Sequence, residues 1–186
     1  AATDTLGNAL GKLQGQINAM DWTGDTGDDL LVAGGKINDE FTYLNHDDVE
    51  MYGGEGNDTV VSNTGTAVSI TGGEGDDFIS IKGSYKNTIV GGLGNDTISL
   101  DWGSNNALIQ YTAGDGSDLI TGFDEYSTLN IIKSEFTSAT ADNDLIITVG
   151  EDSILLRNAE TFSAILYGRD DTDGYSKAGG HKRRGR

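Results

Sequence analysis

A nine-residue phrase occurs three times in this chain, and each copy begins 19 residues after the one before. The copies begin at Gly53, Gly72 and Gly91, and each reads Gly-Gly-x-Gly-Asx-Asp followed by a short, partly apolar stretch. Less complete copies flank them at residues 34–39 and 113–118. A repeat of this length is typical of a solenoid, in which each repeat forms one coil and buries its apolar face against its neighbours.

The residue types in the phrase indicate a cation site. Glycines accept positive φ angles and close backbone approach, so a glycine-rich turn can point its carbonyl oxygens inward. The aspartate at the sixth position adds a charged oxygen. Calcium takes six to eight oxygen ligands, more than one short turn can supply. Because neighbouring strands lie about 4.8 Å apart, two turns one coil apart could hold an ion between them. The sequence therefore predicts several Ca²⁺ ions along one edge.

The predicted ligands are the glycines and the Asx residues at equivalent positions of each turn, with the sixth-position aspartates forming an acidic ladder. They are Gly34, Asn38 and Asp39; Gly53, Gly54, Gly56, Asn57 and Asp58; Gly72, Gly73, Gly75, Asp76 and Asp77; Gly91, Gly92, Gly94, Asn95 and Asp96; and Gly114, Gly116 and Asp118. On the opposite edge only the first two turns end in aspartate. We therefore predict at most one ion there, between Asp29 and Asp48.

The residues between the turns predict two strands per coil. Positions two and four before each phrase, and seven after its start, are apolar in every copy with the exception of Asn87. The positions between them are mostly Ser, Thr or Glu. Alternation with a period of two residues is typical of a half-buried strand. We expect the apolar rows to form a thin core between two sheets.

These phrases, together with the downstream stretches at residues 116–124, 143–150 and 153–156, resemble the RTX family of secreted calcium-binding proteins, specifically its 19-residue repeat variants. The resemblance covers residues 21–122. It implies an all-β fold, a right-handed parallel β-roll or β-solenoid with calcium in its turns, export by type I secretion, and folding outside the cell. Two positions depart from the pattern: Ile37 replaces the third glycine of the first phrase, and Ala113 replaces the first glycine of the last.

The remaining segments are predicted to close the two ends of the roll. Within residues 1–20, an amphipathic helix is expected over residues 4–20, where Leu6, Leu10, Leu13, Ile17 and Met20 recur at helical spacing. It could cap the first coil or dock another subunit. Residues 123–168 are expected to form a β-meander cap, with strands near 128–132, 144–149 and 153–157. Residues 169–186 form a polar tail that ends in basic residues.

Composition excludes several functions. The chain has no cysteine and therefore no disulfide framework. Its formal net charge of −18 disfavours nucleic-acid binding. No apolar run approaches the length of a membrane span. The only histidines, His46 and His181, do not lie near a nucleophile motif, so we expect no enzymatic activity.

The sequence thus predicts an extracellular, secreted or surface-associated calcium-binding β-roll that serves as a surface, adhesive or matrix module. Self-assembly, head to tail into oligomers or filaments, is a further expectation because an open solenoid end exposes unpaired backbone groups. The alternative is a C-terminal secretion and folding module of a larger type I-secreted exoprotein. An enzyme is the least favoured reading. Outward Thr and Ser rows would suit ice binding, but Val61 and Phe78 interrupt them.

Overall fold

The structure is a computed structural model that describes residues 30–44, 47–101, 106–132, 134–159, 165–170 and 174–177. Every regular element within these ranges is a β-strand. The helix predicted at residues 4–20 lies outside the described residues, as do residues 178–186 of the polar tail.

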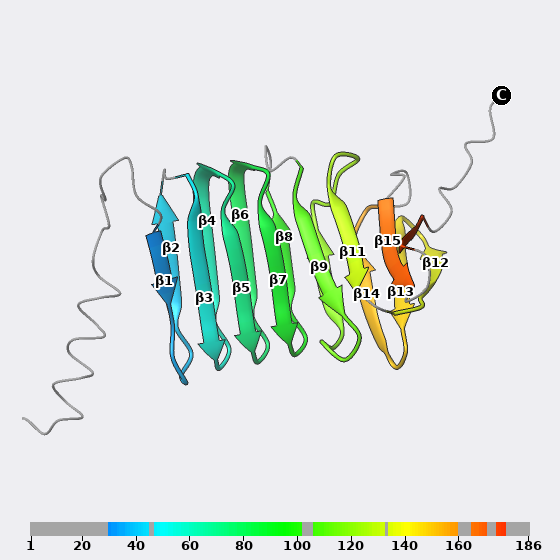
Figure 1. The fold of residues 1–186 in the computed structure, drawn as a ribbon, viewed down its shortest axis with the longest axis horizontal. Helices are drawn as coiled ribbons and strands as arrows, with labels where there is room; N and C mark the ends of the chain where they lie inside the picture. Colours follow the sequence, from blue (N-terminus) through cyan, green and yellow to red (C-terminus); the bar gives the residue numbers. More distant parts are fainter. Residues whose placement is uncertain are drawn as a thin grey trace, which may run out of the picture.

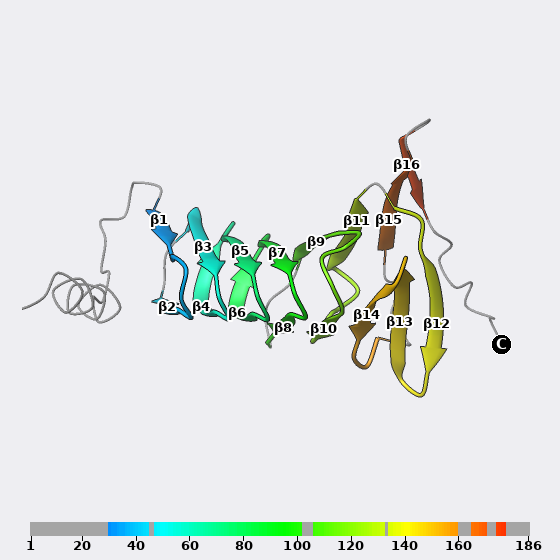
Figure 2. The same ribbon diagram turned by 90° about the horizontal axis from the view of Figure 1, so that it is seen from below.

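The described strands form two facing sheets of eight strands each (Figures 1 and 2). The first sheet has the order β1-β3-β5-β7-β9-β11-β15-β16, and the second has the order β12-β13-β14-β10-β8-β6-β4-β2. From β1 to β11, successive strands along the chain alternate between the sheets. Each pair of strands therefore makes one coil, and the coils lie side by side (Figure 1).

The strand bounds follow the repeat. The first sheet contains β1 (Leu30–Ala33), β3 (Val49–Glu55), β5 (Ser69–Glu74), β7 (Thr88–Leu93), β9 (Leu108–Thr112), β11 (Thr128–Ile132), β15 (Ile165–Asp170) and β16 (Gly174–Lys177). The second contains β2 (Glu40–Leu44), β4 (Thr59–Thr66), β6 (Phe78–Tyr85), β8 (Thr97–Leu100), β10 (Asp118–Thr121), β12 (Thr137–Ala141), β13 (Asp144–Val149) and β14 (Asp152–Leu156).

The register of the parallel pairs reproduces the 19-residue period. Phe41 pairs with Val60, Val60 with Ile79, and Ile79 with Ile98. Equivalent residues of successive coils therefore stack directly on one another. The predicted all-β parallel solenoid is confirmed for the described residues.

The regular spacing ends after β8. Ile89 in β7 pairs with Ile109, 20 residues later, whereas Ile98 in β8 pairs with Ile120, 22 residues later. One extra residue therefore lies between β8 and β9, and two more lie in the turn between β9 and β10. This longer turn changes the end of the predicted cation edge.

The downstream strands lie close to where the sequence predicts them, but they combine differently. β11 is not part of a meander: it pairs in parallel with β9, with Leu129 opposite Ile109, and so continues the coil stack. The antiparallel meander is β12-β13-β14, and β14 continues the second sheet in parallel beside β10. Both sheets thus run past residue 122, and the predicted division into segments stays a prediction.

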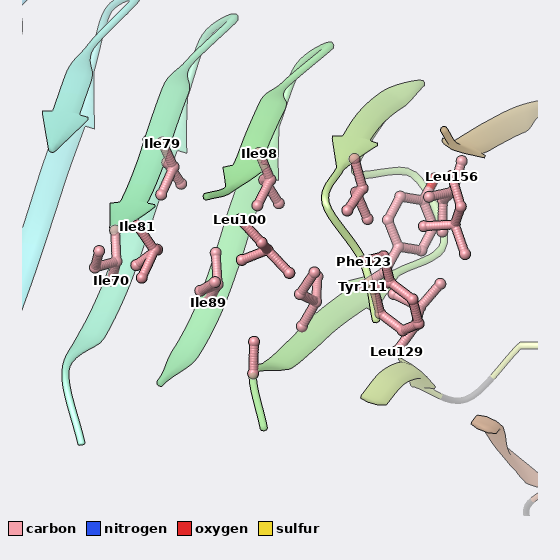
Figure 3. Packing of buried hydrophobic residues seen from close by; sticks show 14 of the residues in the cluster. Ile70, Ile79, Ile81, Ile89, Ile98, Leu100, Tyr111, Phe123, Leu129 and Leu156 are labelled. Carbon is pink, nitrogen blue, oxygen red and sulfur yellow. The ribbon is translucent and has the colours of Figure 1, made fainter. Parts of the chain in front are cut away.

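The core is a thin apolar layer between the sheets (Figure 3). Ile70, Ile79 and Ile89 are fully buried in it. Burying one such side chain contributes about 1.5–3 kcal/mol, so one coil alone stabilises little and the stack is needed. Toward the end of the stack the core gains two buried aromatic residues, Tyr111 and Phe123.

Asn87, the polar exception in the apolar rows, points inward as the register requires and is fully buried. Its Oδ1 accepts hydrogen bonds from the Val68 amide, at 3.2 Å, and from the Ser84 hydroxyl, at 2.8 Å. The first bond joins successive coils at the edge opposite the glycine-rich turns, and the second lies within one turn.

Candidate metal centre

The glycine-rich turns connect the first sheet to the second at one edge of the roll. Gly54, near the end of β3, and Gly56, in the turn after it, have φ angles of 117° and 115°. Residues with a Cβ rarely adopt such angles, which explains the glycines in the repeat. The first turn is built differently because neither Gly35 nor Ile37 takes a positive φ. A β-branched residue such as Ile37 strongly disfavours that region.

The sixth-position aspartates form the predicted ladder, and all are buried. They are Asp39, Asp58, Asp77, Asp96 and Asp118, with exposed fractions between 1% and 7%. One oxygen of each carboxylate, Oδ1, accepts a hydrogen bond from the backbone amide of the aspartate one coil earlier, from Asp58 onward. The donor–acceptor distances range from 2.7 Å, for the Asp39 amide to Asp58, to 3.0 Å, for the Asp96 amide to Asp118.

The fifth-position residues form a second ladder that runs in the opposite direction. The Asn38 side-chain oxygen accepts from the Asn57 amide, Asn57 from Asp76, and Asp76 from Asn95, at 2.8–3.0 Å. The row continues when Asn95 accepts from the Ser117 amide. These predicted ligands therefore already use an oxygen to join the coils. Sequence reasoning missed the Ser117 end of the row, because serine replaces Asx there.

The second carboxylate oxygen distinguishes the three central coils from the ends. Oδ2 of Asp58, Asp77 and Asp96 is buried and has no hydrogen-bond partner. A buried charged oxygen without a partner is strongly unfavourable. In the first turn, by contrast, Asp39 Oδ2 accepts from the Gly35 amide at 3.0 Å. Three buried oxygens are thus left available to a cation.

Carbonyl oxygens lie beside these free carboxylate oxygens. A Cβ placed on Gly53 would overlap both Asp58 Oδ2 and the carbonyl oxygen of Gly72, one coil later. A Cβ on Gly72 would overlap Asp77 Oδ2 and the carbonyl oxygen of Gly91 in the same way. Only glycine therefore leaves this space open. Carboxylate and carbonyl oxygens are the ligands that Ca²⁺ prefers, so these residues fit the ion.

The electrostatics of the ladder also favour a cation. Burial, reinforced by the charges of the neighbouring aspartates, raises the pKa of Asp77 from its ordinary 3.8 to about 6. Burial likewise raises the pKa of Asp96 to about 6 and that of Asp118 to about 7, and it raises the pKa of Asp58. Hydrogen bonds from backbone amides offset only part of this effect. The carboxylates therefore lack sufficient positive charge around them.

Within the described residues, no group of three or more acidic, His or Cys side chains converges on one point. An ion at this edge would thus be held by one or two carboxylates and by backbone carbonyl oxygens. Stacked turns supply such a mixed set of carboxylate and carbonyl ligands. The positions of the acidic residues alone do not predict it.

The last turn departs from the prediction. Because Val90 pairs with Gln110, the residue equivalent to Gly91 is Tyr111 rather than Ala113. The predicted alignment was therefore wrong by two positions at Ala113, where the turn begins, whereas Ser117 and Asp118 at its end are equivalent to Asn95 and Asp96 as predicted. Gly114 correspondingly lies away from the ladder, where an added Cβ would meet no atom within 4 Å.

The opposite edge gives little support for an ion. Asp48 is exposed, has a φ of 55°, and donates its amide to the Thr66 carbonyl at 2.9 Å. Its predicted partner Asp29 lies outside the described residues. The ion predicted between them stays a prediction.

The fold and this edge together define a class: an all-β parallel solenoid whose turns stack a buried aspartate ladder. No protein-family model matches the chain, and no curated protein matches it. Among solved structures it is similar to the extracellular lipase LipA from Serratia marcescens, with 12% sequence identity and a TM-score of 0.33. The match covers 69% of this chain and 36% of the lipase chain. Similarity this weak carries no functional assignment.

No helix among the described residues is long and apolar enough to cross a membrane.

Proposed function

We propose that this protein is an extracellular calcium-binding structural protein of the RTX type, without enzymatic activity, which folds when calcium binds. One observation carries the proposal: Oδ2 of Asp58, Asp77 and Asp96 is buried without a partner. The first two of these oxygens also lie beside a carbonyl oxygen of the next coil, in a space that only glycine leaves open.

The ligands of the ions would be these carboxylates and the neighbouring carbonyl oxygens, among them those of Gly72 and Gly91. Bound calcium would supply the positive charge that the ladder lacks. The chain's own residues prepare the site. Hydrogen bonds from backbone amides to Oδ1 hold each carboxylate in place, and the glycines leave room for the ion.

The energies involved are large enough to couple binding to folding. Two carboxylates one coil apart, about 4.8 Å, repel each other by about 3.5 kcal/mol at an effective dielectric constant of 20. Several such contacts are comparable with the ~5–15 kcal/mol that stabilises a typical domain. Calcium removes the repulsion and adds ligation energy to the folded state alone, so the ion should drive folding.

This coupling suits a protein that works outside the cell, where calcium is abundant, and that stays unfolded at low calcium during export. The net charge of −18 keeps such an unfolded chain soluble. Once folded, the roll would serve as a rigid surface, adhesive or matrix module.

Circular dichroism of the whole chain during a calcium titration tests the proposal. We expect a disordered spectrum in a calcium chelator and a strand-rich spectrum in millimolar calcium, with magnesium at the same concentration much less effective. The smaller Mg²⁺ ion demands an octahedral shell and loses its waters reluctantly. A spectrum that does not change between chelator and calcium would contradict calcium-driven folding.

A further inference from the structure

The first and last turns of the cation edge both lack the feature that defines a site in the three central turns, which is a buried carboxylate oxygen without a hydrogen-bond partner. The two turns lack it for different reasons. Five buried aspartates form the ladder, but only the three central ones have a buried oxygen without a partner. The first and the last, Asp39 and Asp118, do not share this feature.

At the first end, the turn satisfies its own aspartate. Asp39 Oδ2 accepts from the Gly35 amide at 3.0 Å, a bond that the three regular turns lack. Ile37 stands where those turns have a glycine of positive φ. The first turn therefore donates an N–H group to Asp39 Oδ2, although the carbonyl oxygen of Gly53 lies beside this oxygen as the next coil's carbonyl does in the regular turns.

In the last turn, between β9 and β10, a residue with a large side chain occupies the position that is glycine in the regular turns. In those turns a Cβ on Gly53, Gly72 or Gly91 would overlap the Oδ2 of the aspartate five residues later. The equivalent residue of the last turn is Tyr111, which is only 2% exposed. From Tyr111 to Asp118 this turn has eight residues, against six from Gly91 to Asp96, so the turn is longer where it holds the larger side chain.

Tyr111 also forms a hydrogen bond with a carbonyl oxygen of its own turn. Its hydroxyl donates to the carbonyl oxygen of Gly116 at 2.6 Å. A carbonyl oxygen of a glycine-rich turn, which in calcium sites is a common type of ligand, is here engaged by a neutral donor. Tyr111 thus places a buried side chain at the position of the regular glycine and engages a carbonyl oxygen with its hydroxyl.

We infer that this edge binds three cations, one at each of Asp58, Asp77 and Asp96, and that Tyr111 and the Gly35 amide end the row by closing the positions beside Asp118 and Asp39. The inference rests on the proposed function and adds to it the number of ions and the residues that set this number. A row of stacked turns has no intrinsic end, so its length must be set by residues that replace a ligand or block a site.

Isothermal titration calorimetry with calcium, checked by metal analysis after dialysis, tests the number. Wild-type protein should bind three high-affinity ions. Asp96→Asn should lower the number to two, because the amide keeps the oxygen that accepts from the backbone and loses the charge. Asp118→Asn and Asp39→Asn should leave it at three. No binding by wild-type protein would overturn the proposed function itself, whereas four or five ions, or a loss with Asp118→Asn, would overturn only this inference.

A gain of binding tests the role of Tyr111. Replacing residues 111–118 by the sequence of residues 91–96 restores the short turn and the glycine, and should raise the number from three to four. Tyr111→Phe keeps the ring and should leave the number at three, with the strand-rich spectrum confirming the fold. A number of four in Tyr111→Phe, or of three in the folded replacement, would show that Tyr111 does not close the row.

Discussion

At the scale of single residues, each central aspartate of the ladder has one oxygen that the protein satisfies and one that it leaves free. The Asp77 carboxylate accepts from the Asp58 amide through Oδ1, at 2.7 Å, and its Oδ2 has no partner. Hydrogen bonding to one oxygen fixes the orientation of the other. The carboxylate is thus held in position before any ion binds, which reduces the entropic cost of binding.

Asp77→Asn should weaken calcium-dependent folding strongly. The amide would keep the bond from Asp58 but would place an N–H group, or a neutral oxygen, where the cation needs a charged ligand. We expect the calcium midpoint of the circular dichroism transition to rise at least tenfold, which corresponds to about 1.4 kcal/mol. Glu74→Gln, which makes the same change of charge at an exposed position of the same turn, should shift it little. Equal shifts would mean that only overall charge matters.

Acid should partly replace calcium. The folded-state pKa values of Asp77 and Asp96, about 6, and of Asp118, about 7, lie above the ordinary 3.8. The calcium-free fold therefore binds protons more tightly than the unfolded chain does, so its stability is greatest below pH 3.8 and is lost as the pH rises through 6–7. We expect calcium-free protein to gain strand signal on acidification from pH 8 to pH 5, and its calcium affinity to fall over the same range.

The double variant Asp77→Asn/Asp96→Asn is the control for this pH dependence. Its ladder lacks two of the carboxylates with raised pKa, so its calcium-free spectrum should change less between pH 8 and pH 5. A pH response as large as that of wild-type protein would assign the effect to other carboxylates.

At the scale of elements, each turn shapes the space for an ion by leaving out a side chain. Gly72 has no positive φ, so its importance does not come from backbone freedom. It comes from the two oxygens, Asp77 Oδ2 and the Gly91 carbonyl oxygen, that its Cβ would overlap. Gly35, at the second position of the first turn, has no atom within 4 Å of the place of its Cβ.

Gly72→Ala should therefore disturb the roll, whereas Gly35→Ala should be tolerated. Overpacking at a closely packed position typically costs about 1–3 kcal/mol, and here it also displaces ligand oxygens. We expect the first variant to have a lower melting temperature in calcium and a higher calcium midpoint, and the second to behave like wild-type protein. Thermal unfolding followed by circular dichroism would measure both. Similar behaviour of the two alanine variants would argue against an ion at Gly72.

At the scale of the whole molecule, the roll combines a strongly acidic body with sheets that end in edge strands. The described part of the second sheet ends at β2 and at β12, and the five side chains of β12 are all exposed and uncharged. β2 and β12 have the same length, and both run parallel to β14 and β10. An edge strand without charge or proline is a template for pairing with another chain.

Self-association in calcium should therefore depend on β12. We expect wild-type protein to form oligomers or filaments in millimolar calcium, which both folds the roll and lowers its self-repulsion, and Ala139→Lys to prevent this without unfolding the roll. Thr66→Lys, at an exposed position of β4, a strand paired on both sides, is the matched control. Sedimentation velocity would distinguish the species. Wild-type protein that stays monomeric at high concentration in calcium would rule out this assembly.

The repeat pattern alone was enough to predict the parallel solenoid, the edge with glycine-rich turns and the row of aspartates along it. These features depend on local chemistry repeated at a fixed spacing: a 19-residue period brings equivalent residues into one row, as the pairing of Val60 with Ile79 confirms. The calcium ligands, the N-terminal helix and the absence of enzymatic activity stay predictions. The strand β12 was missed because its residues, Thr-Ser-Ala-Thr-Ala, are all exposed and show no alternation.

How the row of turns ends could not be predicted from the sequence, because it depends on contacts made in the folded roll. Whether Tyr111 or Ala113 is equivalent to Gly91 depends on where two extra residues are accommodated, and only strand register shows this. Whether a carboxylate oxygen is free depends on an amide brought near it by folding, as Gly35 is to Asp39. Repetition in a sequence predicts what the coils share, whereas the differences between coils arise from contacts that exist only once the chain is stacked.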